Sequence, residues 1–181
     1  MSWLLSLSIV LGVTFLDMLT KGLTEVYLSL GSSVTVIEGV LNFTYVRNSG
    51  AAFSILAGQT WFFIVTASIA SIVMVAFLFK NKFGSKVLQI GVSLMLAGTL
   101  GNLYDRIAFG EVRDMIEVTF VDFAIFNVAD MALCIGVALV IIFIIFIYKD
   151  KSKEKKEEEA TLEKVYETEQ VDEPHSEATD E

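Results

Sequence analysis

Four long apolar blocks limit the folds open to this chain more than any other feature of its sequence. They run from about Trp3 to Leu23, Trp61 to Phe79, Val87 to Asp105 and Phe126 to Tyr148. Each approaches or exceeds the length of about 20 residues that an α-helix needs to cross a bilayer. Because lipid offers no partners to backbone polar groups, only helices and closed barrels satisfy the backbone there. The sequence therefore predicts an all-α membrane protein, a four-transmembrane-helix bundle.

The distribution of lysines predicts the orientation of these spans. The segment Lys80–Lys86 carries 3 lysines, and Lys149–Lys156 carries 5. Cytoplasmic loops hold an excess of Lys and Arg, so we expect both segments and both chain termini in the cytoplasm. The first block has no basic n-region and no small-residue cleavage site, so we expect a retained span rather than a cleaved signal peptide. The connectors 24–60 and 107–125 then face outward.

Both outward connectors contain strand-like segments. Thr35–Arg47 is rich in β-branched and aromatic residues with partial alternation, and Met115–Phe123 has a similar composition. Such runs are typical of β-strands. We therefore expect a small extracytoplasmic β-like cradle above the helices.

The chain changes character after the fourth block. Residues 149–181 hold 6 Lys against 13 Asp or Glu, which gives this segment −7 of the total charge of −9. A segment of this composition cannot bury enough apolar surface to fold. We therefore expect a membrane domain at 1–148 and a charged, disordered cytoplasmic tail at 149–181. The low pI describes this tail, and we expect no nucleic-acid partner.

Polar side chains are predicted to collect at one depth of the membrane. The topology places Asp17 with Lys21, Asn102–Arg106, and Asn127–Asp130 all at outer span ends, with Asp114 in a mobile connector between them. Ionisable groups in spans are costly and are functional-site candidates. Helical spacing puts Asp17 and Lys21 on one face. Asp105 adjoins Arg106, which favours a structural ion pair or a helix-end network there.

The available residue types restrict the chemistry to acids. His175 lies in the tail and Cys134 has no base near it in sequence, so a nucleophile–base set is absent. We expect neither a metal site nor a cofactor. Two neighbouring carboxyls share one proton, so one can activate water while the other supports a carbonyl oxygen. The residues alone leave catalysis, a small proton-coupled transporter or channel subunit, and a non-catalytic scaffold open, although the apolar inner halves of the spans count against a transport path.

Five motifs in order resemble the lipoprotein signal peptidases, also called signal peptidase II. They are Asp17-x-x-x-Lys21, the Arg-Asn-x-Gly-Ala-Ala-Phe of Arg47–Phe53, the Gly-Asn-x-x-Asp-Arg of Gly101–Arg106, Asp114 eight residues beyond that Arg, and the Phe-Asn-x-Ala-Asp of Phe126–Asp130. The resemblance implies an intramembrane aspartyl endopeptidase of the bacterial cytoplasmic membrane. Such enzymes remove signal peptides from diacylglyceryl-modified prolipoproteins, cutting before the lipidated cysteine.

The resemblance also implies roles for individual residues. Asp114 and Asp130 are expected to be the catalytic pair, near the outer face. Residues expected to bind substrate or support the site are Asn48, Gly50, Asn102, Arg106 and Asn127, and those expected to give structural polar support are Asp17, Lys21 and Asp105. The expected partners are lipid-modified prolipoproteins and membrane lipids, and the chain is expected to be a monomer.

The first catalytic acid departs from the family pattern. The family usually has Asp-Phe there, whereas this chain has Asp114-Met115, and the pair Asp122-Phe123 lies further on. The offset from Arg106 favours Asp114. Which of the two aspartates faces Asp130 stays open, and Glu117 is a further acid in the same connector.

Overall fold

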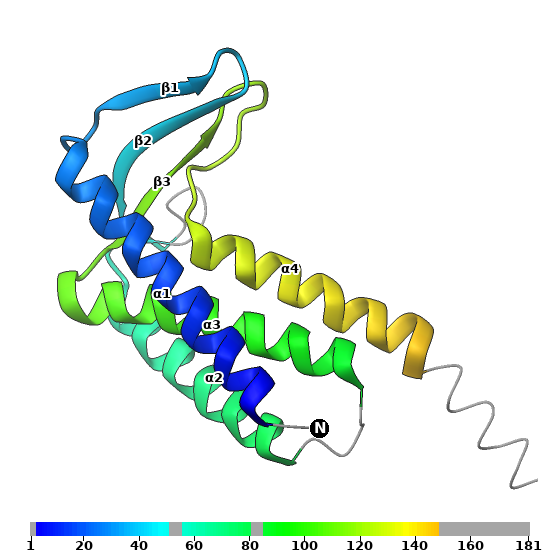
Figure 1. Cartoon of the computed structure of the whole chain (residues 1–181). Coiled ribbons are helices and arrows are strands. Elements are labelled where there is room, and N and C mark those ends of the chain that lie inside the picture. The colour runs from blue at the N-terminus through cyan, green and yellow to red at the C-terminus, as the bar shows by residue number, and fades with distance from the viewer. Residues whose placement is uncertain (1–2, 51–55, 81–84, 149–181) are drawn as a thin grey trace, which may run out of the picture. The chain divides into compact units, whose positions relative to one another are not determined.

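The structure is a computed structural model that describes residues 3–50, 56–80 and 85–148 (Figure 1). The chain divides into two compact units, residues 1–140 and 141–181. The second unit starts with the end of a helix and continues as a π-helix at Phe143–Tyr148. The predicted tail at 149–181 lies outside the described residues. All features discussed below belong to the first unit.

Four helices in the described part of the chain are long and apolar enough to cross a membrane, which confirms the predicted spans. Their bounds are α1 (Trp3–Tyr27), α2 (Thr60–Lys80), α3 (Lys86–Phe109) and α4 (Val128–Ile142). The fourth span consists of α4 and its helical continuation to Phe146. The third helix runs past the predicted end at Asp105. It stops only where Gly110 takes a left-handed conformation and donates its N–H to the Arg106 carbonyl oxygen.

Helix α3 is the buried centre of the helical layer. In its most apolar stretch 61% of residues are buried, against 6% in α2. It packs against α1 and α2. It also meets α4 closely, because an added Cβ at Gly98 would overlap the carbonyl oxygen of Ala129. Small residues allow such close approach in membranes, while the exposed apolar faces of the other helices suit lipid.

Three antiparallel strands form a sheet in the order β1 (Ser33–Ile37), β2 (Leu41–Asn48) and β3 (Val112–Val118). The predicted strands are thereby confirmed, but the bounds of the last one were wrong. Asp114 lies inside β3, opposite Val46, and not in a mobile loop. The cause is burial: the first four residues of β3 are all buried, and the chain turns only after Val118.

The sheet lies at one end of the helices. Figure 1 shows it beyond the C-terminal end of α1 and the N-terminal end of α4. Strand β3 also contacts α1 and α3. The ends of three helices and one edge of the sheet therefore meet in one region, and that region holds the polar residues.

Candidate active site

A buried ionic network ties α1 to α3 and α4. Lys21 Nζ lies 2.8 Å from Asp17 Oδ2 and 3.3 Å from Asp105 Oδ2, and all three side chains are fully buried. Asp17 also accepts a hydrogen bond of 2.9 Å from the backbone N–H of Ala129, in the first turn of α4. Buried charges are costly unless they are paired. Here each charge has an opposite charge beside it.

Asp105 pairs with Arg113 and not with Arg106, its neighbour in sequence. Arg113 Nη2 lies 2.7 Å from Asp105 Oδ1, and Arg113 Nε lies 3.3 Å from Asp105 Oδ2. Consecutive helix positions point in different directions, so the side chains of Asp105 and Arg106 do not face each other. Arg106 instead donates to the carbonyl oxygen of Gly50 at 2.9 Å and stacks 4.7 Å above the Phe63 ring.

Two further carboxylates, Asp114 on β3 and Asp130 on α4, are held by amides. Asp114 accepts hydrogen bonds from Asn127 Nδ2 at 2.6 Å and from Asn48 Nδ2 at 3.1 Å. Asp130 accepts one from Asn102 Nδ2 at 2.7 Å and one from the backbone N–H of Asn127 at 3.1 Å. Asn127 therefore contacts both acids and brings them to one place.

The start of α4 explains how Asn127 does this. Its Oδ1 accepts a hydrogen bond of 2.9 Å from the backbone N–H of Asp130, while the Asp130 carboxylate accepts the backbone N–H of Asn127. This reciprocal pair is a capping box, which satisfies N–H groups at a helix start. Because the cap uses the oxygen of the Asn127 amide, its nitrogen is turned toward Asp114.

The surroundings of Asp114 change its acidity. Burial raises the pKa of this carboxyl to about 7, and the negative charge of Asp130 adds to the effect. The hydrogen bonds from Asn48 and Asn127 act in the opposite direction. Asp114 therefore keeps its proton to near-neutral pH beside a second carboxylate. A pair in this state holds one acid and one base, and the two titrate together.

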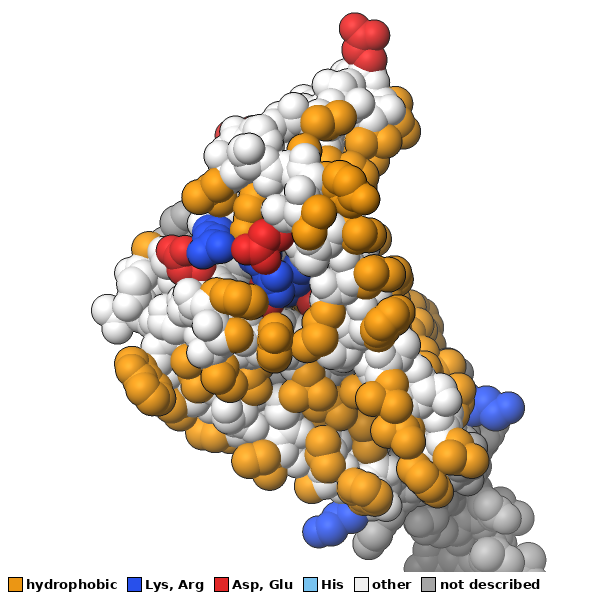
Figure 2. Space-filling view, turned by 60° about the vertical axis from the view of Figure 1, so that its left-hand side comes forward, with side chains coloured by type: hydrophobic (Ala, Val, Ile, Leu, Met, Phe, Trp, Pro, Cys, Tyr) orange, Lys and Arg blue, Asp and Glu red, His pale blue; other side chains and the backbone are white. Residues whose placement is uncertain are grey.

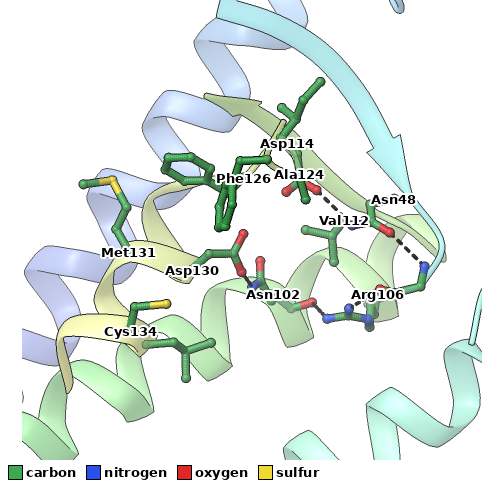
Figure 3. A pocket seen from close by; sticks show the side chains of 14 residues that line it. Asn48, Asn102, Arg106, Val112, Asp114, Ala124, Phe126, Asp130, Met131 and Cys134 are labelled. Carbon is green, nitrogen blue, oxygen red and sulfur yellow. Dashed lines mark hydrogen bonds between the residues drawn. The ribbon is translucent and has the colours of Figure 1, made fainter. Parts of the chain in front are cut away.

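The two acids open onto a cavity of about 440 Å³ (Figure 3). In Figure 3, Asp114 reaches in from the sheet, Asp130 from α4, and Asn102 and Arg106 from α3. The cavity also has an apolar side. Its apolar lining includes Val112, Phe123, Ala124, Ile125, Phe126, Met131, Leu133 and Cys134.

The other acids considered for this position do not line this cavity. Asp122 is exposed in the turn after β3. Glu117 accepts hydrogen bonds from Asn42 and Thr44 on β2. Of these three acids, Asp114 is therefore the one that lines the same cavity as Asp130. Figure 2 shows a small cluster of charged side chains on a face that is otherwise mostly hydrophobic or uncharged, apart from a few separate charges at its top and bottom.

The sequence reasoning assigned no role to Arg113 or Glu25. Arg113 is buried and also lies 3.0 Å from Glu25, through its Nη1 and the Oε2 of Glu25. One signal could have pointed to Arg113. It is a charged residue in a strand that is otherwise mostly apolar, directly before Asp114, so its burial required a carboxylate partner.

The fold and the site together define a membrane-spanning protein with a carboxylate pair in a partly apolar cavity, as an aspartic hydrolase requires. The sequence model of the family described as "Signal peptidase (SPase) II" matches residues 9–146. The lipoprotein signal peptidase of Latilactobacillus sakei is 46% identical over 136 residues, which cover 74% of this chain and 90% of that protein.

Other relatives agree. The lipoprotein signal peptidase of Lactiplantibacillus plantarum is 39% identical over 135 residues, which cover 75% of this chain and 90% of that protein. A solved bacterial membrane enzyme has a TM-score of 0.74 at 40% identity, covering 82% of this chain and 90% of its own. The chain therefore belongs to the signal peptidase II family, and it is a membrane peptidase.

Proposed function

We propose that this chain removes signal peptides from diacylglyceryl-modified prolipoproteins, cutting before the lipidated cysteine, with Asp114 and Asp130 as its catalytic pair. The observation that carries the proposal is the shared contact with Asn127, which holds one oxygen of each acid while both carboxyl groups line one cavity. Membership of the family supports the substrate class.

The chemistry follows from the state of the pair. The ionised carboxylate takes a proton from a water molecule as the water oxygen attacks the scissile carbonyl carbon. The protonated carboxyl donates a hydrogen bond to the carbonyl oxygen, where negative charge develops. The raised pKa of Asp114 supports the second role for this residue, and the first for Asp130. The proton gained from water then passes to the leaving amine.

The other polar residues support this pair. Asn48, Asn102 and Asn127 orient the carboxylates through the hydrogen bonds described above. Arg106 holds the Gly50 carbonyl, and both residues line the cavity, where they would contact a substrate. The network of Asp17, Lys21 and Asp105 fixes the helices beneath the site. Its members do not line the cavity, which supports a structural role.

The orientation in the membrane follows from charge. The buried Asp, Lys and Arg side chains of the described residues all lie at the sheet end, whereas Lys80 and Lys86 lie at the other end of α2 and α3. Because Lys-rich connectors stay in the cytoplasm, the sheet and the site face outward and both termini face inward. Residues 1–148 then form the membrane domain and 149–181 a cytoplasmic tail.

We also infer that the chain acts as a monomer surrounded by membrane lipid. The exposed apolar side chains of α1 and α2 are the surface that lipid would cover. The buried ionisable groups of the described residues gather at one end, which also counts against a proton path across the membrane, because such a path requires ionisable groups at several depths.

Cleavage of a purified prolipoprotein in detergent tests the proposal. The substrate with diacylglycerol on its cysteine should be cut before that cysteine, and the unmodified substrate should be cut poorly. Asp114→Asn and Asp130→Asn should each lower the rate by about 10²–10⁴-fold, because each removes one member of the acid–base pair.

Asp122→Asn is the matched control, since it removes an exposed acid from the same connector. It should keep wild-type activity. Full activity in both variants of the pair would exclude the proposed catalytic residues. Proton flux into liposomes without any peptidase activity would instead favour a transporter.

A further inference from the structure

Two arginines stand opposite each other on the sheet. Arg47 on β2 and Arg113 on β3 are Cα partners in the antiparallel register. Like charges directly opposite each other destabilise a strand pair. Glu25, near the end of α1, contacts both: its Oε1 lies 3.1 Å from Arg47 Nη2 and its Oε2 lies 3.0 Å from Arg113 Nη1. One carboxylate therefore bridges two cations that would otherwise repel each other.

Each of these arginines directly precedes a residue of the cavity. Arg47 precedes Asn48, and Arg113 precedes Asp114, and successive side chains of a strand point to opposite faces. Asn48 and Asp114 line the cavity and are joined by a hydrogen bond of 3.1 Å. Glu25 therefore holds the two arginine side chains on one face of the strand pair, and the Asn48–Asp114 contact lies on the other face.

The exposure and the other partners of these three side chains show which charge can be removed without unfolding the protein. Arg113 is 7% exposed and keeps Asp105 as a second partner, so loss of Glu25 does not leave it unpaired. Arg47 and Glu25 are 35% and 38% exposed, and Arg47 Nε also donates to the Tyr45 hydroxyl at 3.2 Å. Neutral substitutions at Glu25 or Arg47 should therefore still give a folded protein.

We propose that Glu25 is a positioning residue of the peptidase, which acts through Arg47 and Arg113 to hold Asn48 against Asp114. It does not line the cavity and does not contact the acid pair itself. The proposal rests on the proposed catalytic role of Asp114. It assigns Glu25 an effect on the chemical step and none on the binding of substrate.

Steady-state kinetics of Glu25→Gln on the lipid-modified prolipoprotein test this role. We expect kcat to fall about tenfold with KM unchanged, because a small misplacement of a reacting group lowers the rate of the chemical step. Glu38→Gln is the matched control, since Glu38 is an exposed glutamate in the turn between β1 and β2. It should behave as wild type. A wild-type kcat in Glu25→Gln would overturn the proposal.

The double variant Glu25→Gln/Arg47→Gln separates bridging from general stabilisation. Glu25→Gln alone should keep about one tenth of the wild-type kcat. The double variant also lacks one of the two facing cations, so its kcat should rise to about one third of the wild-type value. Arg47→Gln alone should have the same kcat as the double variant. Contacts that merely stabilise the fold independently would give additive losses instead. A double variant that is slower than Glu25→Gln would therefore overturn the bridge.

Two further measurements keep the test decisive. If Glu25→Gln does not fold in detergent, Arg47→Gln alone tests the same bridge from its exposed end, and an unchanged kcat would overturn the proposal. Asp114→Asn, measured alongside, checks the function on which this inference rests. Full activity in that variant would overturn the proposed function itself, and the role of Glu25 with it.

Discussion

Two groups of acids lie side by side in this protein, and they differ in their partners. Asp17 and Asp105 each lie within ion-pair distance of Lys21, and Asp105 also pairs with Arg113. Asp114 and Asp130 receive hydrogen bonds from amide groups. Among the described residues, no ion pair joins either of these two acids to Lys or Arg.

The difference in partners separates structure from chemistry. An acid beside a cation is chemically quiet, because its charge is already compensated. An acid held by neutral amides beside another acid keeps its charge uncompensated, so the pair retains a proton that it can donate. Asn102 connects the groups, because it accepts from Lys21 and donates to Asp130. The ionic network can thus fix the pair without neutralising it.

Asp105→Asn should have the largest effect on stability, because it removes the negative charge that lies between Lys21 and Arg113. Breaking a buried ion pair by removing one partner costs about 3–5 kcal/mol in the free energy of unfolding. Thermal unfolding in detergent, compared with the wild-type protein, measures this loss. The expected result is a large fall in the unfolding temperature.

Asp114→Asn is the contrasting variant. It should abolish activity but leave the unfolding temperature at pH 8 unchanged or higher, because burial already disfavours the charged form of this side chain. If Asp105→Asn and Asp114→Asn destabilised the protein equally, the division between the two groups would fail.

Gly98→Ala should have a smaller effect, and it should lower both stability and catalytic rate. The added methyl group would overlap the Ala129 carbonyl oxygen and press on Leu133, so α4 would have to move. Overpacking of this kind costs about 1–3 kcal/mol. Because Asp130 follows Ala129 directly, the shift should also lower kcat. Unfolding temperature and kcat measured on the same sample test both effects.

Gly12→Ala is the matched control in another span. An added Cβ there meets nothing within 4 Å. Alanine is a better helix former than glycine by about 1 kcal/mol, so this variant should be as stable as wild type or more so. Equal losses in the two glycine variants would show that the close contact of α3 with α4 does not matter.

The sequence predicted the parts of this protein that depend on local patterns. The spans follow from runs of apolar residues. The contact of Asp17 with Lys21 follows from helical spacing. Each of these signals is contained in one short stretch, so folding elsewhere in the chain does not change it.

The parts that could not be predicted depend on contacts between distant stretches. Glu25 and Arg113 are 88 positions apart, and no local pattern pairs them. Adjacency in sequence suggested Arg106 as the partner of Asp105, but β3 brings Arg113 to it instead. The strand position of Asp114 was also missed, because the alternation in β3 is broken by two charged residues that are buried only through tertiary contacts.

The pH dependence of stability and activity should give the smallest of the expected differences between the two groups of acids. The folded-state pKa of Asp114 is about 7, against an ordinary value of 3.8, so the folded state holds this proton where the unfolded state has lost it. Stability should therefore fall as pH rises from about 4 to 7 and then level off. Activity should fall by up to tenfold per pH unit above about 7, as the pair loses its shared proton.

Initial rates and unfolding temperatures between pH 5 and 9 measure both the fall in stability and the fall in activity. In Asp114→Asn the contribution of this group to the stability slope should vanish, whereas Asp122→Asn should retain it. An activity profile that stays flat from pH 6 to 9 would mean that the pair does not work with a single shared proton.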